Sequence, residues 1–111
     1  MNRVQLIGNL GRDAENKPAN GTRSRTTFSI ATNRRWKDEQ SGDWKEQTEW
    51  HDIVAWGKIA DATATLTKGA RVFVEGQLRS REYKKDEVTH RTYEIVADTV
   101  APIVKTERAP E

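Results

Sequence analysis

The spacing of apolar residues along the chain is the feature that most restricts its fold. Five segments are rich in β-branched and aromatic residues and read as β-strands, and the first of them begins with the apolar–polar alternation of a half-buried strand. One segment changes this period, because Ile59, Ala62 and Leu66 recur on one helical face and Gly69 follows as a helix-ending residue. The chain is therefore predicted to be mainly β, with one short helix between its third and fourth strands. The five predicted strands are residues 4–10, 26–32, 49–56, 71–83 and 89–100.

Three strands, a helix and two further strands match the five-stranded OB-fold, a Greek-key barrel. Gly8 and Gly11 lie within or beside the first strand, where a small barrel needs a bulge or a sharp bend. A length of 111 residues fits one domain. We expect the OB-fold domain to span residues 1–102 and a short disordered tail to span residues 103–111. Turns are expected at Asn20-Gly21, at Ser41-Gly42 and over residues 84–87.

Composition excludes several classes of protein. The chain has no cysteine, so disulfides and thiolate metal sites are ruled out. Its first residues lack the apolar stretch of a secretory signal, and no apolar run is long enough to cross a bilayer. We therefore expect a cytoplasmic protein that does not bind membranes.

Motifs typical of enzymes are also missing. His51 and His90 are the two histidines of the chain, and it contains no HExxH sequence, P-loop or dinucleotide fingerprint. The carboxylates are spread along predicted turns and strands, without a spacing that demands a catalytic pair. A metal-dependent nuclease would need a cluster of carboxylates in space, and the sequence leaves this one enzyme class open. We expect no catalytic residue, no bound metal and no cofactor.

All four tryptophans lie close together in a polar part of the chain. They are Trp36, Trp44, Trp50 and Trp56, and the last two share a parity that directs both to one face of a strand. An exposed aromatic ring stacks on any nucleobase, and duplex DNA hides its base faces, so this pattern favours single strands. Alternatively, Trp50 and Trp56 are half-buried strand residues without a binding role, since aromatic residues favour strands. The alternative for Trp44 is that it packs against a loop or forms a subunit contact.

Charge is unevenly distributed, although the formal net charge is only +2. Residues 1–35 and 62–93 are net basic, and they flank the net acidic, tryptophan-rich segment 36–61. If the two basic segments lie side by side, their side chains can neutralise phosphates. The candidate phosphate-binding residues are Arg3, Arg34, Arg35, Lys37, Lys45, Lys58, Lys68, Arg79, Arg81, Lys84 and Lys85.

Four segments resemble, in order, those of the bacterial-type single-stranded DNA-binding protein family. The segments are NRVQLIGNLGRD (2–13), KEQTEWH (45–51), WGKIA (56–60) and KGARVFVEGQL (68–78). The resemblance extends from residue 2 to about residue 101. It implies sequence-nonspecific binding and protection of single-stranded DNA in replication, recombination and repair, with RNA as a weaker partner, and a nucleoid-associated location.

The same resemblance implies roles for individual residues. Bases are expected to stack on Trp36, Trp50, Trp56 and Tyr83, although the family often has Phe at the position of Trp56 and Trp at that of Tyr83. A homotetramer built as a dimer of dimers is implied. The residues expected at its subunit interface are Asn2, Val4, Leu6 and His51.

The chain departs from this family in three respects. Glu39 and Glu82 stand where relatives often have Lys, and the long tail with an acidic tip that recruits replication partners is missing. Recruitment of partners through a tail is therefore not expected. The main alternative function is a protein–protein adaptor on the same barrel, like the small primosomal OB proteins, which keep fewer stacking aromatics.

Overall fold

The computed structural model describes residues 1–18 and 23–104 of the chain. The five predicted strands and the helix between the third and the fourth of them are confirmed, and one further short strand is present. The expected Asn20-Gly21 turn lies outside the described residues, as does most of the expected tail. The elements are β1 (Val4–Leu10), β2 (Glu15–Lys17), β3 (Arg25–Lys37), β4 (Trp44–Trp56), α1 (Lys58–Thr63), β5 (Arg71–Lys85) and β6 (Val88–Pro102).

The strands form one sheet in the order β1-β5-β6-β4-β3-β2, and it closes into a barrel because β1 also pairs with β3. Closure depends on Gly8, which pairs with Val72 of β5 and directly precedes Asn9, where the pairing of β1 with β3 begins. A Cβ atom at Gly8 would lie 2.4 Å from the carbonyl oxygen of Ala31, so only glycine allows the two backbones to approach this closely. Gly8 thus serves a close approach of strands, and the register shift lies elsewhere, between Glu75 and Gly76 in β5.

Alternate residues of the barrel strands point inward and form the core. Ile30, Val72 and Val74 have no exposed surface. Thr26 is also fully buried, and its Oγ1 donates a 2.6 Å hydrogen bond to the carbonyl of Ala60, which ties α1 to β3. The buried cluster consists of Leu10, Phe28, Ile30, Ile53, Ala55, Ala60, Val72, Val74, Ile95 and Ala97.

The helix is shorter than the sequence predicts. It ends at Thr63, so placing Leu66 on its apolar face was wrong. Leu66 packs against the core from the following turn, with its N–H bonded to the carbonyl of Thr63. The threonines that alternate from Thr63 to Thr67 explain the early end, because β-branched side chains crowd a helix and Thr63 Oγ1 bonds back to the carbonyl of Ile59 at 2.8 Å.

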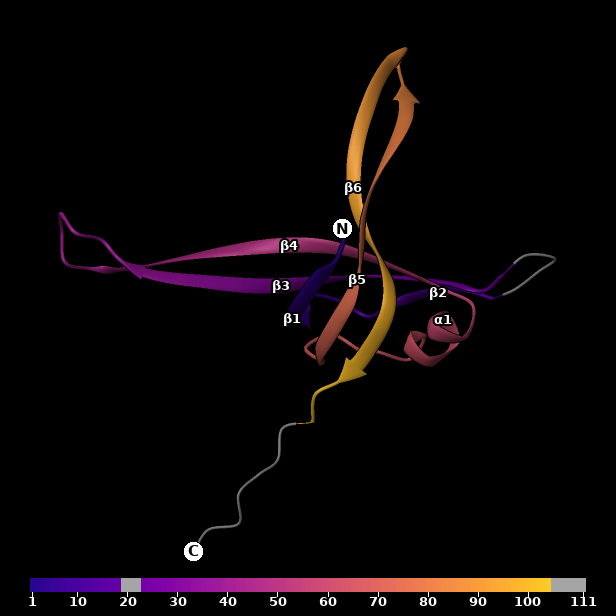
Figure 1. Cartoon of the computed structure of the whole chain (residues 1–111), viewed down its shortest axis with the longest axis horizontal. Helices are drawn as coiled ribbons and strands as arrows, with labels where there is room; N and C mark the ends of the chain where they lie inside the picture. Colours follow the sequence, from indigo (N-terminus) through magenta and orange to yellow (C-terminus); the bar gives the residue numbers. More distant parts are fainter. Residues whose placement is uncertain (19–22, 105–111) are drawn as a thin grey trace, which may run out of the picture.

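Two hairpins continue beyond the barrel in different directions (Figure 1). The β3–β4 arm consists of residues 32–49, and the β5–β6 arm consists of residues 77–94. Most side chains of both arms are exposed, because the arms extend past the core. The β5–β6 arm ends in a two-residue turn at Asp86 and Glu87, whose φ angles of 53° and 63° match the twist that a tight hairpin requires.

Candidate nucleic-acid interface

The register of β3 and β4 determines which face of the sheet each tryptophan occupies. Trp44, Trp50 and Trp56 pair with Lys37, Ala31 and Arg25, and side chains at paired positions point to the same face. These three tryptophans therefore share the outer face of β4, opposite Ile53 and Ala55 of the core, although Val54 on the face of the tryptophans is also buried. The predicted common face of Trp50 and Trp56 is confirmed. Trp36 pairs with Lys45 and lies on the other face of the β3–β4 arm.

Trp50 is an exposed ring that rests on the backbone. Its side chain lies at the end of the barrel and 59 % of the residue is exposed. A Cβ atom at Gly11 would lie 2.5 Å from Cζ3 and 2.6 Å from Cη2 of this ring. The missing side chain at Gly11 therefore makes room for the indole, while its remaining surface is open to a ligand.

Trp56 is half-buried and lies beneath two guanidinium groups. Those of Arg23 and Arg25 are 5.4 Å and 5.7 Å from the ring centre, within the range of cation–π attraction. Nε of Arg25 is buried and has no hydrogen-bond partner among the described residues. This arrangement places positive charge beside an aromatic ring, as binding of a nucleotide requires.

The β3–β4 arm carries two further arginine–tryptophan pairs, one on each face. Arg34 lies 5.2 Å from the ring of Trp36, and Arg35 lies 5.6 Å from the ring of Trp44. Trp36 is half-buried and Trp44 is 64 % exposed. Lys45, on the face of Trp36, forms a 3.0 Å ion pair with Asp38.

The β5–β6 arm presents a pair of stacked rings. Tyr83 and His90 are register partners with ring centres 5.2 Å apart and planes inclined by 20°. Tyr83 is exposed, and Arg81 lies on the same face two residues earlier in β5. The sequence predicts that Tyr83 stacks on a base, but it gives no sign that His90 would stack on the ring of Tyr83.

A hollow of about 170 Å³ lies between the β5–β6 arm and the barrel portions of β3 and β4. Arg12, Arg25 and Arg81 contribute to its lining, together with Tyr93 of β6. Sequence reasoning missed Arg12, Arg25 and Tyr93. Tyr93 has the parity of the buried Ile95, which predicts an inward side chain, but β6 has already left the core at this point and Tyr93 is 57 % exposed.

The remaining predicted cations are distributed over both arms and the barrel. Arg3 lies 4.0 Å from Glu75, a weak pair at the surface. Glu82, which stands where relatives often have Lys, pairs with Arg91. Exposed cations lie at Lys37 on the β3–β4 arm, at Lys58 in α1, at Lys68 before β5, and at Arg79, Lys84 and Lys85 on the β5–β6 arm.

Of the predicted interface residues, Asn2 precedes β1, Val4 and Leu6 lie in β1, and His51 lies in β4. Asn2 exchanges two hydrogen bonds with the backbone of Leu78, at 2.8 Å and 2.9 Å. Val4 and Leu6 are half-buried against the core. His51 is half-buried, with Nε2 2.8 Å from Oγ1 of Thr32.

No group of three metal-ligating side chains occurs within residues 1–18 and 23–104. None of the helices described there is long and apolar enough to cross a membrane.

The chain is similar in sequence and structure to known single-stranded DNA-binding proteins. Residues 1–103 match the model of the single-strand binding protein family. A Plasmodium falciparum SSB, solved in complex with ssDNA, is 32 % identical with a TM-score of 0.85, and the match covers 94 % of this chain and 96 % of that one. A deletion mutant of the single-stranded DNA binding protein from Thermus aquaticus is 28 % identical with a TM-score of 0.81. That match covers 94 % of this chain but 51 % of the other, so this chain spans about half its length.

Proposed function

The chain belongs to the single-strand binding protein family, and we propose that it binds single-stranded DNA without sequence preference. Binding would protect transiently exposed strands during replication, recombination and repair. The observation that carries the proposal is the set of exposed aromatic rings on the barrel and its two arms, of which Trp50 and Tyr83 are the most open among those predicted. The single-strand binding protein family is a family of DNA-binding proteins and not of enzymes, as expected from the sequence.

In the proposed mechanism, bases stack on the rings and phosphates contact the flanking cations. Stacking contributes about 1–3 kcal/mol per base and is insensitive to base identity, because every base has a π-face. Phosphate contacts release counterions, so affinity falls as salt rises. The stacking residues proposed are Trp36, Trp50, Trp56 and Tyr83. The proposed phosphate contacts are Arg3, Arg34, Arg35, Lys37, Lys45, Lys58, Lys68, Arg79, Arg81, Lys84 and Lys85, to which the structure adds Arg12, Arg23 and Arg25 as candidates.

The proposed assembly is a homotetramer formed from two dimers, with β1 at the subunit contact. Val4 to Ile7 pair with β5, and β1 meets β3 only at Asn9 and Leu10, so one edge of the segment 4–7 has no partner strand within the described residues. An open edge can pair with a second copy. Ile7 is 48 % exposed beside that edge. The Ile7→Glu variant should sediment as a smaller species than the wild-type protein, and an unchanged assembly would exclude β1 as the contact.

Competition binding tests the proposed ligand. Labelled oligo-dT should be displaced by unlabelled oligo-dT, less well by oligo-U, and poorly by duplex DNA of equal length, because the duplex hides its base faces. Equal competition by duplex and single strands would contradict stacking as the source of binding. In the cell, we propose a cytoplasmic, nucleoid-associated location.

A further inference from the structure

Trp44 is the most exposed tryptophan in the described part of the chain, with 64 % of the residue exposed. It is the first residue of β4, at the outer end of the β3–β4 arm. Burial in the core therefore does not explain why a large aromatic ring stands at this position. Among the described residues, its one aromatic–cation contact is with Arg35, whose guanidinium covers one side of the ring. The other side is available for stacking.

Trp44 continues the line formed by Trp50 and Trp56. The three tryptophans share one strand and one face, and each lies six residues from the next. With a rise of about 3.4 Å per residue, six residues correspond to roughly 20 Å along β4. Trp36, in contrast, lies on the opposite face of the arm. A strand that follows the outer face from Trp56 past Trp50 would therefore reach Trp44 next.

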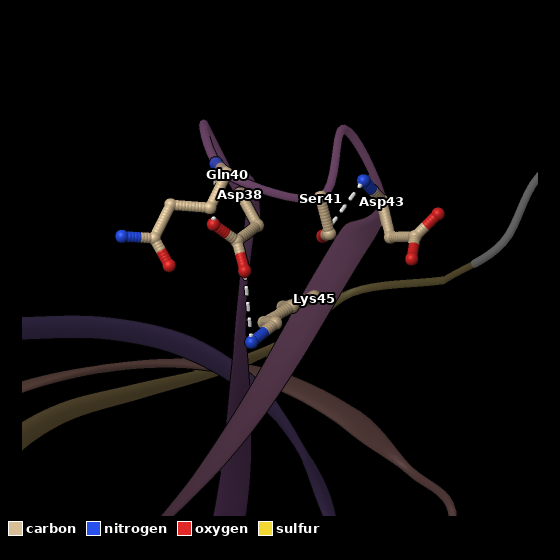
Figure 2. Close-up of polar contacts among 5 residues, drawn as sticks. All are labelled: Asp38, Gln40, Ser41, Asp43 and Lys45. Atoms are coloured by element: carbon tan, nitrogen blue, oxygen red, sulfur yellow. Dashed lines mark hydrogen bonds and ion pairs between the residues drawn. The ribbon is translucent and has the colours of Figure 1, made fainter.

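The turn that precedes Trp44 is held by several hydrogen bonds (Figure 2). The N–H of Asp38 donates to the carbonyl of Asp43 and the N–H of Gly42 to the carbonyl of Asp38, both at 2.8 Å. Asp38 Oδ1 accepts from the N–H of Gln40 at 3.0 Å, and Ser41 Oγ accepts from the N–H of Asp43 at 3.2 Å. This network fixes the backbone next to Trp44, so little ordering is needed when a base binds.

Two cations lie beside Trp44, although the segment 36–61 is net acidic and Asp43 directly precedes the ring. Lys37 is its register partner, and Arg35 lies on its ring. Glu46 shares this face as the register partner of Arg35. Within residues 1–18 and 23–104, however, neither Arg35 nor Lys37 has a carboxylate at ion-pairing distance. Both cations are therefore available to phosphates beside the exposed ring.

We propose that Trp44, with Arg35 and Lys37, is an additional base-stacking site that extends the DNA track along β4 to the tip of the β3–β4 arm. The occupant is single-stranded DNA, and the inference rests on the proposed function. Because Trp44 lies about 20 Å beyond Trp50, only oligonucleotides long enough to span that distance use the site.

The test compares oligo-dT of increasing length on the wild-type protein and three variants, Trp44→Ala, Trp44→Phe and Trp50→Ala. Trp44→Ala should bind short oligonucleotides with wild-type affinity and long ones about 5- to 150-fold more weakly. Trp44→Phe should keep most of the affinity because it keeps a π-face. Trp50→Ala should weaken binding at every length. Because Trp44 and Trp50 are both largely exposed, none of the three substitutions removes a residue of the buried core, and circular dichroism checks that each variant is folded.

The outcomes separate this inference from the proposed function. Wild-type affinity of Trp44→Ala for long oligonucleotides, together with weakened binding of Trp50→Ala, would overturn the role of Trp44 alone. If neither variant loses affinity, the proposed function fails as well. A change in assembly of Trp44→Ala without a change in binding would overturn the inference in favour of a subunit contact. In protein labelled with 5-fluorotryptophan, the ¹⁹F resonance of Trp44 should shift with long oligo-dT and stay in place with short oligo-dT.

Discussion

The indole of Trp50 lies directly on the backbone of Gly11, and no side chain at residue 11 would fit beneath it. The Gly11→Ala substitution should therefore displace the ring of Trp50 from its position on the outer face. We predict weaker binding of oligo-dT, with a loss no greater than the 1–3 kcal/mol or so expected for removal of one stacked base. Fluorescence anisotropy of a labelled oligonucleotide measures the change.

A double-mutant cycle provides the control for this prediction. Once Trp50 is replaced by Ala, the methyl group at residue 11 has no ring to displace, so Gly11→Ala should have no further effect on affinity. Additive losses in the two substitutions would show that Gly11 acts independently of Trp50.

Tyr83 and His90 form the stacked pair of the β5–β6 arm. Tyr83→Leu removes the π-face and should weaken binding of oligo-dT by about 1–3 kcal/mol, whereas Tyr83→Phe should bind nearly as well as wild type. Isothermal titration calorimetry with one oligonucleotide compares them. If the Leu and Phe variants bind equally, the ring of Tyr83 does not stack on a base.

Two valines of different burial test the location of the core. Val72 is fully buried in the barrel, whereas Val88 is 55 % exposed beside the turn of the β5–β6 arm. Val72→Ala should lower the free energy of unfolding by about 2–3 kcal/mol, because it removes buried methyl groups and leaves a cavity. Val88→Ala should lower it by less than about 1 kcal/mol. Urea denaturation measures both, and equal losses would contradict the observed core.

Asp38 predicts a pH dependence of the turn shown in Figure 2. The hydrogen bond from the N–H of Gln40, and next the contact with Lys45, hold the pKa of Asp38 below its ordinary value of 3.8. Since the folded turn prefers the charged carboxylate, this contribution is present above that value and is lost as pH falls through the lowered pKa. A carboxyl ¹³C titration should therefore give Asp38 a midpoint below 3.8, and Lys45→Ala should raise it. A midpoint at or above 3.8 in the wild-type protein would contradict this network.

Much of the barrel could be predicted from the sequence because a period of two is readable wherever one face of a strand is buried. This is true of the segment around Ile30 and of the segment around Val72 and Val74. β2 has only three residues, too few to show a period, and was read as part of a loop. The end of α1 depends on the side-chain hydrogen bond of Thr63, which apolar spacing does not report.

At the candidate site, too, the period of two predicts the direction of a side chain only where one face of the strand is buried. Parity placed Trp50 and Trp56 on one face, because both lie in a strand whose other face is buried. Parity is misleading for Tyr93, which shares the parity of the buried Ile95 but lies beyond the core and is exposed. The contacts of Arg25 with Trp56, and of Gly11 with Trp50, join segments distant in sequence and depend on the register of the strands.

The most direct test of the account is a titration of the protein with oligo-dT while its tryptophan fluorescence is followed. The rings proposed to stack are Trp36, Trp50 and Trp56, so binding at low salt should quench the emission in a saturable manner. The quenching should need more oligonucleotide as salt rises, because phosphate contacts weaken. Folded protein whose emission does not change at low salt would contradict base stacking on these rings.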